Sequence, residues 1–173
     1  FLPMLLLGAW AGAFADRFDR RRTTVITQSL LALQAIVLGV CDVAGVINVE
    51  LVFVLTGLLG IIGAIDNPSR RGLVTELVPP HEIGNAMSLN TAVMTGSRIF
   101  GPALAATLVG PFGTGWLFII NGLSYVFMLY GVVGLRKSEM FTPEPRPAGG
   151  TPVRDGIRFV RTHRRLFPLF VVF

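Results

Sequence analysis

The stretch 16–41, DRFDRRRTTVITQSLLALQAIVLGVC, places a dense cluster of charges directly before a long apolar run. No charged residue occurs in Thr23–Cys41. A helix that crosses the hydrocarbon core of a membrane needs about 20 mainly apolar residues, because each residue adds only about 1.5 Å to its length. The stretch therefore predicts a membrane-spanning helix over about 23–43 that begins immediately after a charged loop.

The composition extends this interpretation to the whole chain. Of the 173 residues, 52% are hydrophobic and 14% are charged, and the mean hydropathy is +0.66. Soluble domains usually contain about 25% charged residues. A second uncharged run, Ile99–Leu135, is too long for a single crossing. We therefore predict an all-α fold, a polytopic membrane helical bundle.

Short polar or glycine-rich segments divide the chain into predicted spans. We expect the end of one transmembrane helix over 1–14, and further spans over 23–43, from about 50 to 65, over 86–109 and over 116–135. Asp66–Arg71 is expected to end the third of these helices, because Pro68 lacks an amide hydrogen and disfavours a helical residue before it. The uncharged segment Gly110–Gly115 is predicted to be a tight turn between the last two spans.

Both ends of the chain lie in apolar stretches, and the chain does not begin with Met. We expect these stretches, 1–14 and 166–173, to be parts of helices in a longer protein. After Leu135 the composition changes to polar residues and a Pro/Gly-rich linker over 142–150. Residues 153–161 then place apolar side chains and arginines on opposite helical faces, which predicts a basic amphipathic helix on the cytoplasmic leaflet.

The basic residues predict the orientation of the helices. Lys and Arg total 15, and apart from Arg98 they lie in three segments, 15–22, 66–85 and 136–165. The intervening loops near 44–50 and 110–115 contain none. Loops rich in Lys and Arg face the cytoplasm in membrane proteins. We therefore expect the three basic segments to be cytoplasmic, and we read the net charge of +5 as a sign of membrane orientation, not of a nucleic-acid partner.

Several other classes of site are not predicted. The single cysteine, Cys41, allows no disulfide framework, and the two histidines have no metal-ligand spacing with other residues. The sequence contains no Gly-x-x-x-x-Gly-Lys-Ser/Thr phosphate-binding loop and no credible catalytic set. We therefore predict no enzymatic activity, no metal and no cofactor.

The loop before the first complete span resembles a transporter signature. Gly12, Asp16, Arg17, Arg20 and Arg21 match the pattern Gly-x-x-x-Asp-Arg-x-Gly-Arg-Arg, which lies between the second and third helices of the major facilitator superfamily. Asp19 replaces the usual glycine. This version, together with Asp66–Arg70, Leu77–Pro79, Asn85–Ala86, Leu89–Asn90 and Arg98–Pro102, resembles the branch that contains enterobactin exporters and drug-efflux proteins.

The resemblance implies a fragment of a twelve-helix protein, from the end of helix 2 to the start of helix 7. Residues 1–135 would form helices 2–6 of the N-terminal six-helix half, 136–165 the cytoplasmic linker between the halves, and 166–173 the start of helix 7. It also implies secondary active export of small molecules, siderophore- or drug-like, across a bacterial-type inner membrane. Alternating access would be driven by proton antiport.

Two alternatives use the same apolar spans. The chain could be the membrane part of an ATP-driven exporter, or a scaffold or sensor that does not transport. An ATPase domain elsewhere in the protein would favour the first. A deletion that left substrate phenotypes unchanged would favour the second. A membrane enzyme is a weaker option because the sequence shows no catalytic set.

The resemblance further implies a conformational switch built from the loop motif and an acid at the end of a neighbouring span. Its residues are Gly12, Asp16, Arg17, Arg20, Arg21 and Asp66. The simpler interpretation is that these charges only anchor the cytoplasmic side. A set of exposed ion pairs could bias a conformation, although each pair contributes only about 0–1 kcal/mol.

Polar residues inside the spans are candidates for the transport pathway. Arg98 is expected to face the bundle interior or a wet cavity, because a charge in the bilayer centre costs about 2.5–3.5 kcal/mol. It could bind substrate or a coupling acid, or it could be a structural pair. Asn90 and Asn121 could line the pathway, and bonding between helices is favoured for both. Gly96, Gly101 and Pro102 are expected to bend their helix or simply to allow close packing.

The switch hypothesis predicts a defined phenotype for Asp16→Asn. This change keeps the shape of the side chain and removes its charge, so transport should fall while membrane insertion is unchanged. Transport into vesicles and the amount of protein in the membrane fraction measure the two effects. Transport at the wild-type rate would contradict the switch role.

Overall fold

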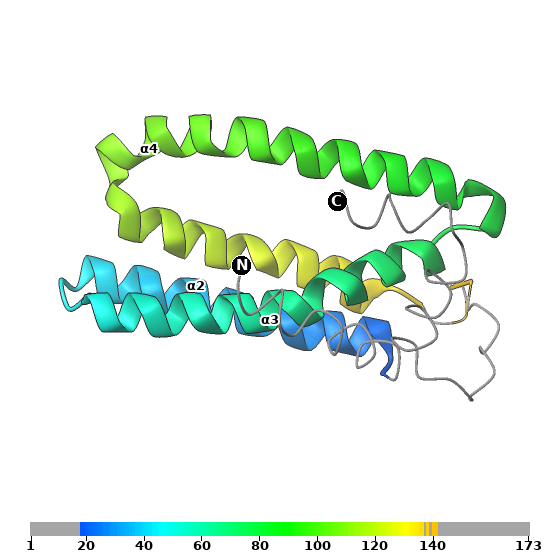
Figure 1. Cartoon of the computed structure of the whole chain (residues 1–173), viewed down its shortest axis with the longest axis horizontal. Coiled ribbons are helices and arrows are strands. Elements are labelled where there is room, and N and C mark those ends of the chain that lie inside the picture. The colour runs from blue at the N-terminus through cyan, green and yellow to red at the C-terminus, as the bar shows by residue number, and fades with distance from the viewer. Residues whose placement is uncertain (1–17, 137, 139, 142–173) are drawn as a thin grey trace, which may run out of the picture. The chain divides into compact units, whose positions relative to one another are not determined.

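The computed structural model describes residues 18–136, 138, 140 and 141, and these residues are helical over most of their length. The elements are α2 (Arg20–Val43), α3 (Val49–Glu76), the short 3₁₀ helix η1 (Pro80–Glu82) and α4 (Ile83–Gly134) (Figure 1). Three helices in this part of the chain are long and apolar enough to cross a membrane. The predicted all-α class is therefore confirmed, while the expectations for 1–14, 142–165 and 166–173 fall outside the described residues.

Local capping fixes the hairpin between α2 and α3. The N–H groups of Gly45 and Val46 bond to the carbonyls of Asp42 and Cys41 at 3.0 Å each, which satisfies the free acceptors at the end of α2. Gly45 has a φ of 69°, a conformation that favours glycine. Asn48 Oδ1 then accepts from the N–H of Leu51 at 2.7 Å and caps α3. The turn of this hairpin, which contains no Lys or Arg, is the loop predicted near 44–50.

Pro68 lies inside α3, so the expected end of this helix at Asp66–Arg71 is wrong. The Asn67 side chain donates to the Gly63 carbonyl at 2.8 Å, and the Ser69 hydroxyl donates to the Ile65 carbonyl at 2.8 Å. These bonds flank the carbonyl that proline leaves without its usual donor. Proline is tolerated in membrane helices where neighbouring side chains bond to the backbone around it. Figure 1 shows α3 bending before its last turns, as expected for a helix that contains proline.

α4 consists of two helical arms that fold back on each other at Gly113. This residue has φ 77° and ψ 166°, which is not a helical conformation. We call 83–112 the first arm and 114–134 the second arm; Figure 1 shows them as the green and yellow limbs of one hairpin. The predicted turn at Gly110–Gly115 is thus confirmed, and the two arms correspond to the two spans expected on either side of it.

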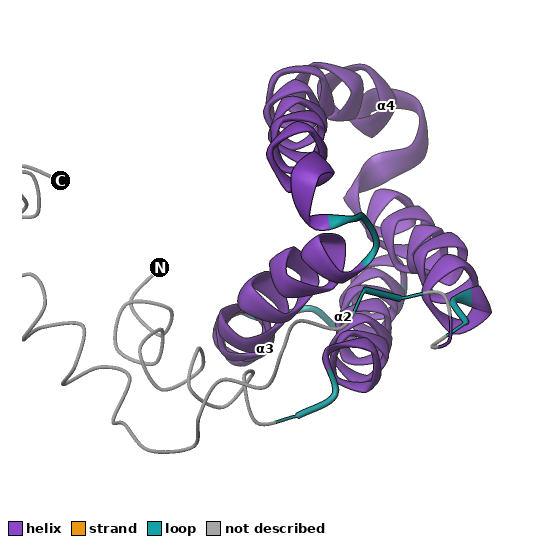
Figure 2. Cartoon of the chain, turned by 90° about the vertical axis from the view of Figure 1, so that its right-hand side faces the viewer, coloured by secondary structure: helices purple, strands orange, loops and turns teal. Residues whose placement is uncertain are grey.

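α2 packs on one side against α3 and on another against the second arm of α4 (Figure 2). The contact with the second arm depends on glycine. A Cβ added to Gly39 would lie 2.6 Å from the Gly115 carbonyl oxygen, and one added to Gly115 would lie 2.9 Å from the Gly39 carbonyl oxygen. Glycine at both positions lets the two backbones touch, as small residues do between membrane helices.

This close approach predicts opposite effects for two Gly→Ala changes. Gly39→Ala should destabilise the bundle by about 1–3 kcal/mol, because the new methyl group overlaps the backbone of α4. The methyl group added by Gly131→Ala would have no atom within 4 Å, so this change should be neutral or stabilising, because alanine favours the helix. Thermal unfolding in detergent measures both, and equal Tm values would contradict the backbone contact.

Candidate functional site

Most charged residues of the described chain gather where α2 begins, α3 ends and α4 ends. We call this region the charged end and define it as residues 19–22, 66–76 and 132–136. Two contacts tie its helix ends together, and a third joins the end of α3 to Phe141. Arg20 pairs with Glu76, Arg21 donates to the Val132 carbonyl, and the N–H of Phe141 donates to the Glu76 carbonyl at 2.8 Å. Two arginines of the loop motif therefore hold three helix ends at one place.

Arg20 lies across the surface of α3 and reaches Glu76. Its Nη1 is 3.4 Å from Glu76 Oε1, and the two side chains are 26% and 17% exposed. A Cβ at Gly72 would lie 2.6–2.7 Å from three atoms of the Arg20 guanidinium, so glycine leaves the space in which this group rests. The pair is partly exposed, which keeps its contribution small and allows it to open without unfolding the helices.

Arg21 contacts the other helix end. Its Nε donates to the Val132 carbonyl at 2.9 Å, and a second nitrogen of its guanidinium donates to the Val133 carbonyl. The last carbonyls of an α-helix have no acceptor role inside the helix, and the helix end carries partial negative charge. The cation therefore caps the C-terminus of α4 both by hydrogen bonds and by electrostatic attraction.

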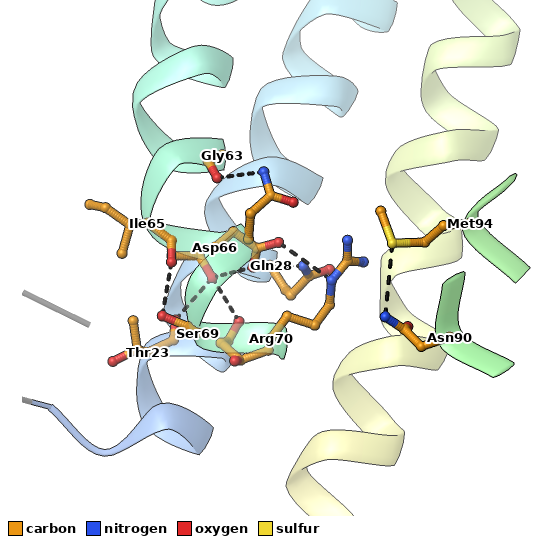
Figure 3. Close-up of polar contacts among 12 residues, drawn as sticks. Thr23, Gln28, Gly63, Ile65, Asp66, Ser69, Arg70, Asn90 and Met94 are labelled. Atoms are coloured by element: carbon orange, nitrogen blue, oxygen red, sulfur yellow. Dashed lines mark hydrogen bonds and ion pairs between the residues drawn. The ribbon is translucent and has the colours of Figure 1, made fainter. Parts of the chain in front are cut away.

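Asp66 is the buried acid of the charged end, with 4% of its surface exposed. Its Oδ1 accepts from Thr27 Oγ1 at 2.7 Å and from Gln28 Nε2 at 2.8 Å, and its Oδ2 lies 3.9 Å from Arg70 Nε (Figure 3). A buried charge is costly unless it is paired and hydrogen-bonded. The two donors from α2 meet this need and fix the register of α3 against α2.

The loop motif and the composition alone do not single out four residues of this site: Thr27, Gln28, Gly72 and Glu76. A sequence signal exists for the first two. Thr23, Thr24, Thr27 and Gln28 all lie on one helical face at spacings of three and four, and all are buried. Hydroxyl and amide groups on one face of an otherwise apolar span indicate a polar partner on the facing helix.

The structure places the remaining predicted site residues in different parts of the chain. Gly12, Asp16 and Arg17 lie outside the described residues. Arg98, Gly101 and Pro102 are exposed on the first arm of α4, and a Cβ at Gly96 or Gly101 would meet no atom within 4 Å. Among residues 18–136, no hydrogen bond or ion pair to Arg98 is found.

The two asparagines of the predicted pathway make their bonds within α4. The Asn90 amide approaches the Met94 sulfur at 3.9 Å, one turn further along the first arm (Figure 3). On the second arm, the main-chain carbonyl of Asn121 accepts from Ser124 Oγ at 2.7 Å, a bond that does not involve the Asn121 side chain. The described chain thus brings Arg20, Arg21 and Asp66 to the charged end and leaves the pathway candidates on α4.

The described residues contain no group of three or more His, Cys, Asp or Glu side chains placed to hold a metal ion. The acids of the charged end point to different partners, Asp66 to α2 and Glu76 to Arg20. The side chains of the charged end are therefore suited to holding α2, α3 and α4 together, through buried bonds at Asp66 and a partly exposed ion pair at Glu76.

Comparison with known proteins identifies the family to which this chain is similar. Residues 1–171 match the family described as transmembrane secretion effector. The chain is 29% identical over 166 residues to an uncharacterized MFS-type transporter, YfiS, of Bacillus subtilis, a match that covers 92% of this chain and 38% of that protein. No solved structure matches.

Two further relatives carry functional names. The chain is 28% identical over 125 residues to the staphyloferrin A transporter of Staphylococcus aureus, which covers 72% of this chain and 32% of that protein. It is 26% identical over 132 residues to the multidrug export protein EmrB of Haemophilus influenzae, which covers 75% of this chain and 25% of that protein. The chain therefore spans two fifths or less of the length of these three relatives.

The buried position of Asp66 predicts that Thr27 supports the fold. Thr27→Val keeps the shape of the side chain and removes one donor to the carboxylate, so unfolding should become easier by about 1.5–3 kcal/mol. Ser29→Ala is the control, because that exposed hydroxyl bonds only to the Val25 carbonyl of its own helix. Denaturant titration of the two variants measures the difference, and identical midpoints would contradict a structural role for the Thr27–Asp66 bond.

Proposed function

The chain belongs to the transmembrane secretion effector family of the major facilitator superfamily, and from this premise we propose that the protein is a secondary active transporter that exports small molecules. Members of this family are multi-pass membrane transporters and not enzymes. The observation that carries the proposal is the match over residues 1–171, to which the geometry adds the gathering of motif arginines at three helix ends.

We propose a siderophore- or drug-like substrate. One relative is named a staphyloferrin A transporter and another a multidrug export protein. Arg98 supports a substrate with an anionic group, because an arginine in the middle of an apolar span is expected to face a cavity or a charged partner. Asn90 and Asn121 are proposed to line the same pathway, and the bend residues Gly96, Gly101 and Pro102 to shape it.

The proposed transport cycle is alternating access with proton antiport in a bacterial-type inner membrane. Residues 1–135 belong in this proposal to the N-terminal half, 136–165 to the cytoplasmic linker and 166–173 to the next helix. The conformational switch includes Gly12, Asp16 and Arg17 of the loop motif. Its described members Arg20, Arg21 and Asp66 lie at the charged end, and the distribution of arginines supports a cytoplasmic position for this end.

The partly exposed Arg20–Glu76 pair supports a switch role better than the buried bonds of Asp66 do. A contact that must form and break in every cycle cannot contribute many kcal/mol, and pairs exposed to solvent usually contribute about 0–1 kcal/mol. Asp66, in contrast, is held by two short hydrogen bonds, so we propose that it is the fixed part of the switch and keeps α3 and α2 in register throughout the cycle.

Proton antiport predicts that export depends on the pH gradient. Inverted vesicles containing the protein should accumulate a siderophore or a drug when the lumen is acidic. Accumulation should be lost when a protonophore collapses the gradient. Vesicles with the Asp16→Asn protein provide the control for leakage. Export that continued after collapse would contradict proton antiport, and export that required added ATP would favour an ATP-driven exporter.

A further inference from the structure

We infer that Arg21 is a positioning residue that joins the end of α4 to the start of α2, so that α2 and the second arm of α4 move as one rigid pair. The inference rests on the proposed transport function, since it concerns how helices move in a cycle. It assigns to Arg21 a specific target, the C-terminal carbonyls of α4, which the loop motif alone does not indicate.

The first step is the chemistry of the Arg21 contact. The guanidinium donates two bonds, through Nε to the Val132 carbonyl and through a terminal nitrogen to the Val133 carbonyl. An arginine can make this fork because its donors are planar and fixed, whereas lysine presents a single rotating ammonium group. Both acceptors belong to the last turn of α4, so the bond acts on the end of the helix and not on one side chain.

The second step is that the same two helices are also joined at their other ends. Thr114 Oγ1, next to the break at Gly113, donates to Asp42 Oδ2 in the last turn of α2. Between the two ends, Gly39 and Gly115 place their backbones in contact. A Cβ added to Gly122 would lie 2.5 Å from Ile36 Cγ1 and 3.0 Å from the Ala32 carbonyl.

The register of this contact resists sliding. A shift of one helical turn moves one helix by about 5.4 Å, which would break the Arg21 and Asp42 bonds together. It would also bring larger side chains against the backbone positions that Gly39 and Gly115 now occupy. Packed interfaces of this kind have discrete arrangements and do not deform continuously. The pair is therefore expected to keep one arrangement.

The third step is the contrast with α3. Side chains join α3 to α2: Arg20 to Glu76, Thr27 and Gln28 to Asp66, and Gln34 to the Leu55 carbonyl at 3.4 Å. Of these, the Arg20–Glu76 pair is the partly exposed contact. Movement at the charged end should therefore occur between the last turns of α3 and the rigid pair, and not inside the pair.

The segment after α4 connects the two moving parts. It starts at Leu135, directly behind the carbonyls that Arg21 holds, and the N–H of Phe141 donates to the Glu76 carbonyl at 2.8 Å. One end of the segment is thus tied to the rigid pair and the other to α3. Opening of the Arg20–Glu76 contact would change the distance between the two ends of this segment. Arg21 holds the end at Leu135 in place.

The test compares Arg21→Gln and Arg21→Lys with Arg22→Gln in the full protein. Arg22 is exposed and adjacent, so its replacement removes the same charge from the same turn of α2 without touching α4. Spin labels on cysteines that replace the exposed residues Ile26 and Phe127, in a background without other cysteines that includes Cys41→Ser, report the distance within the pair. The wild-type protein and Arg22→Gln should give one narrow distance distribution, with and without a pH gradient.

Arg21→Gln should broaden that distribution and lower the turnover of export by about tenfold, with little change in KM, because substrate contacts are untouched. Arg21→Lys should restore part of the turnover, since it supplies the charge without the fork. A narrow distribution in Arg21→Gln, or an equal effect of Arg22→Gln, would overturn the inference. If the wild-type protein exported nothing, the proposed function would fail, while the distances would still decide whether Arg21 holds the pair together.

Discussion

The structure depends on one constraint: inside a bilayer, a backbone N–H or C=O group must find its partner within the protein. Regular helix satisfies most of these groups. The remaining groups, at helix ends and interruptions, depend on polar side chains. Asn48 caps the start of α3, the side chains of Asn67 and Ser69 bond around Pro68, and Arg21 takes the last carbonyls of α4. The polar residues of this chain thus follow the places where the helices are interrupted or end.

The same constraint separates the contacts of the charged end into two classes. Asp66 is buried, and its charge requires the donors that Thr27 and Gln28 provide, so this cluster belongs to the permanent fold. The Arg20–Glu76 pair is partly open to solvent and contributes less, so it can open while the buried cluster stays intact. In the proposed cycle, a switch at the charged end therefore opens the partly exposed Arg20–Glu76 pair and keeps the buried bonds of Asp66.

The long apolar runs were sufficient to predict the existence of the helices, and the glycines of Gly110–Gly115 were sufficient to predict the turn that Gly113 makes. The end of α3 could not be predicted, because whether proline breaks a helix depends on the side chains around it. Here Asn67 and Ser69 bond to the two carbonyls on either side of the one that Pro68 leaves without a donor. The loop motif located Arg20 and Arg21 but not their partners. Glu76, Gly72 and the carbonyls of α4 are brought to them only by the packing of three helices. The predictions for 1–14 and 142–173 remain predictions.

The most direct test of this account is the side of the membrane on which the two ends of the α2–α3 hairpin lie. In a background without other cysteines, which includes Cys41→Ser, one cysteine is introduced at Val46, in the exposed turn between α2 and α3, or at His81, in the exposed segment between α3 and α4. A maleimide that cannot cross membranes should label the Val46→Cys protein in intact cells, and the His81→Cys protein only after the membrane is permeabilised. Labelling of both proteins in intact cells, or the reverse pattern, would contradict a bundle whose charged end faces the cytoplasm.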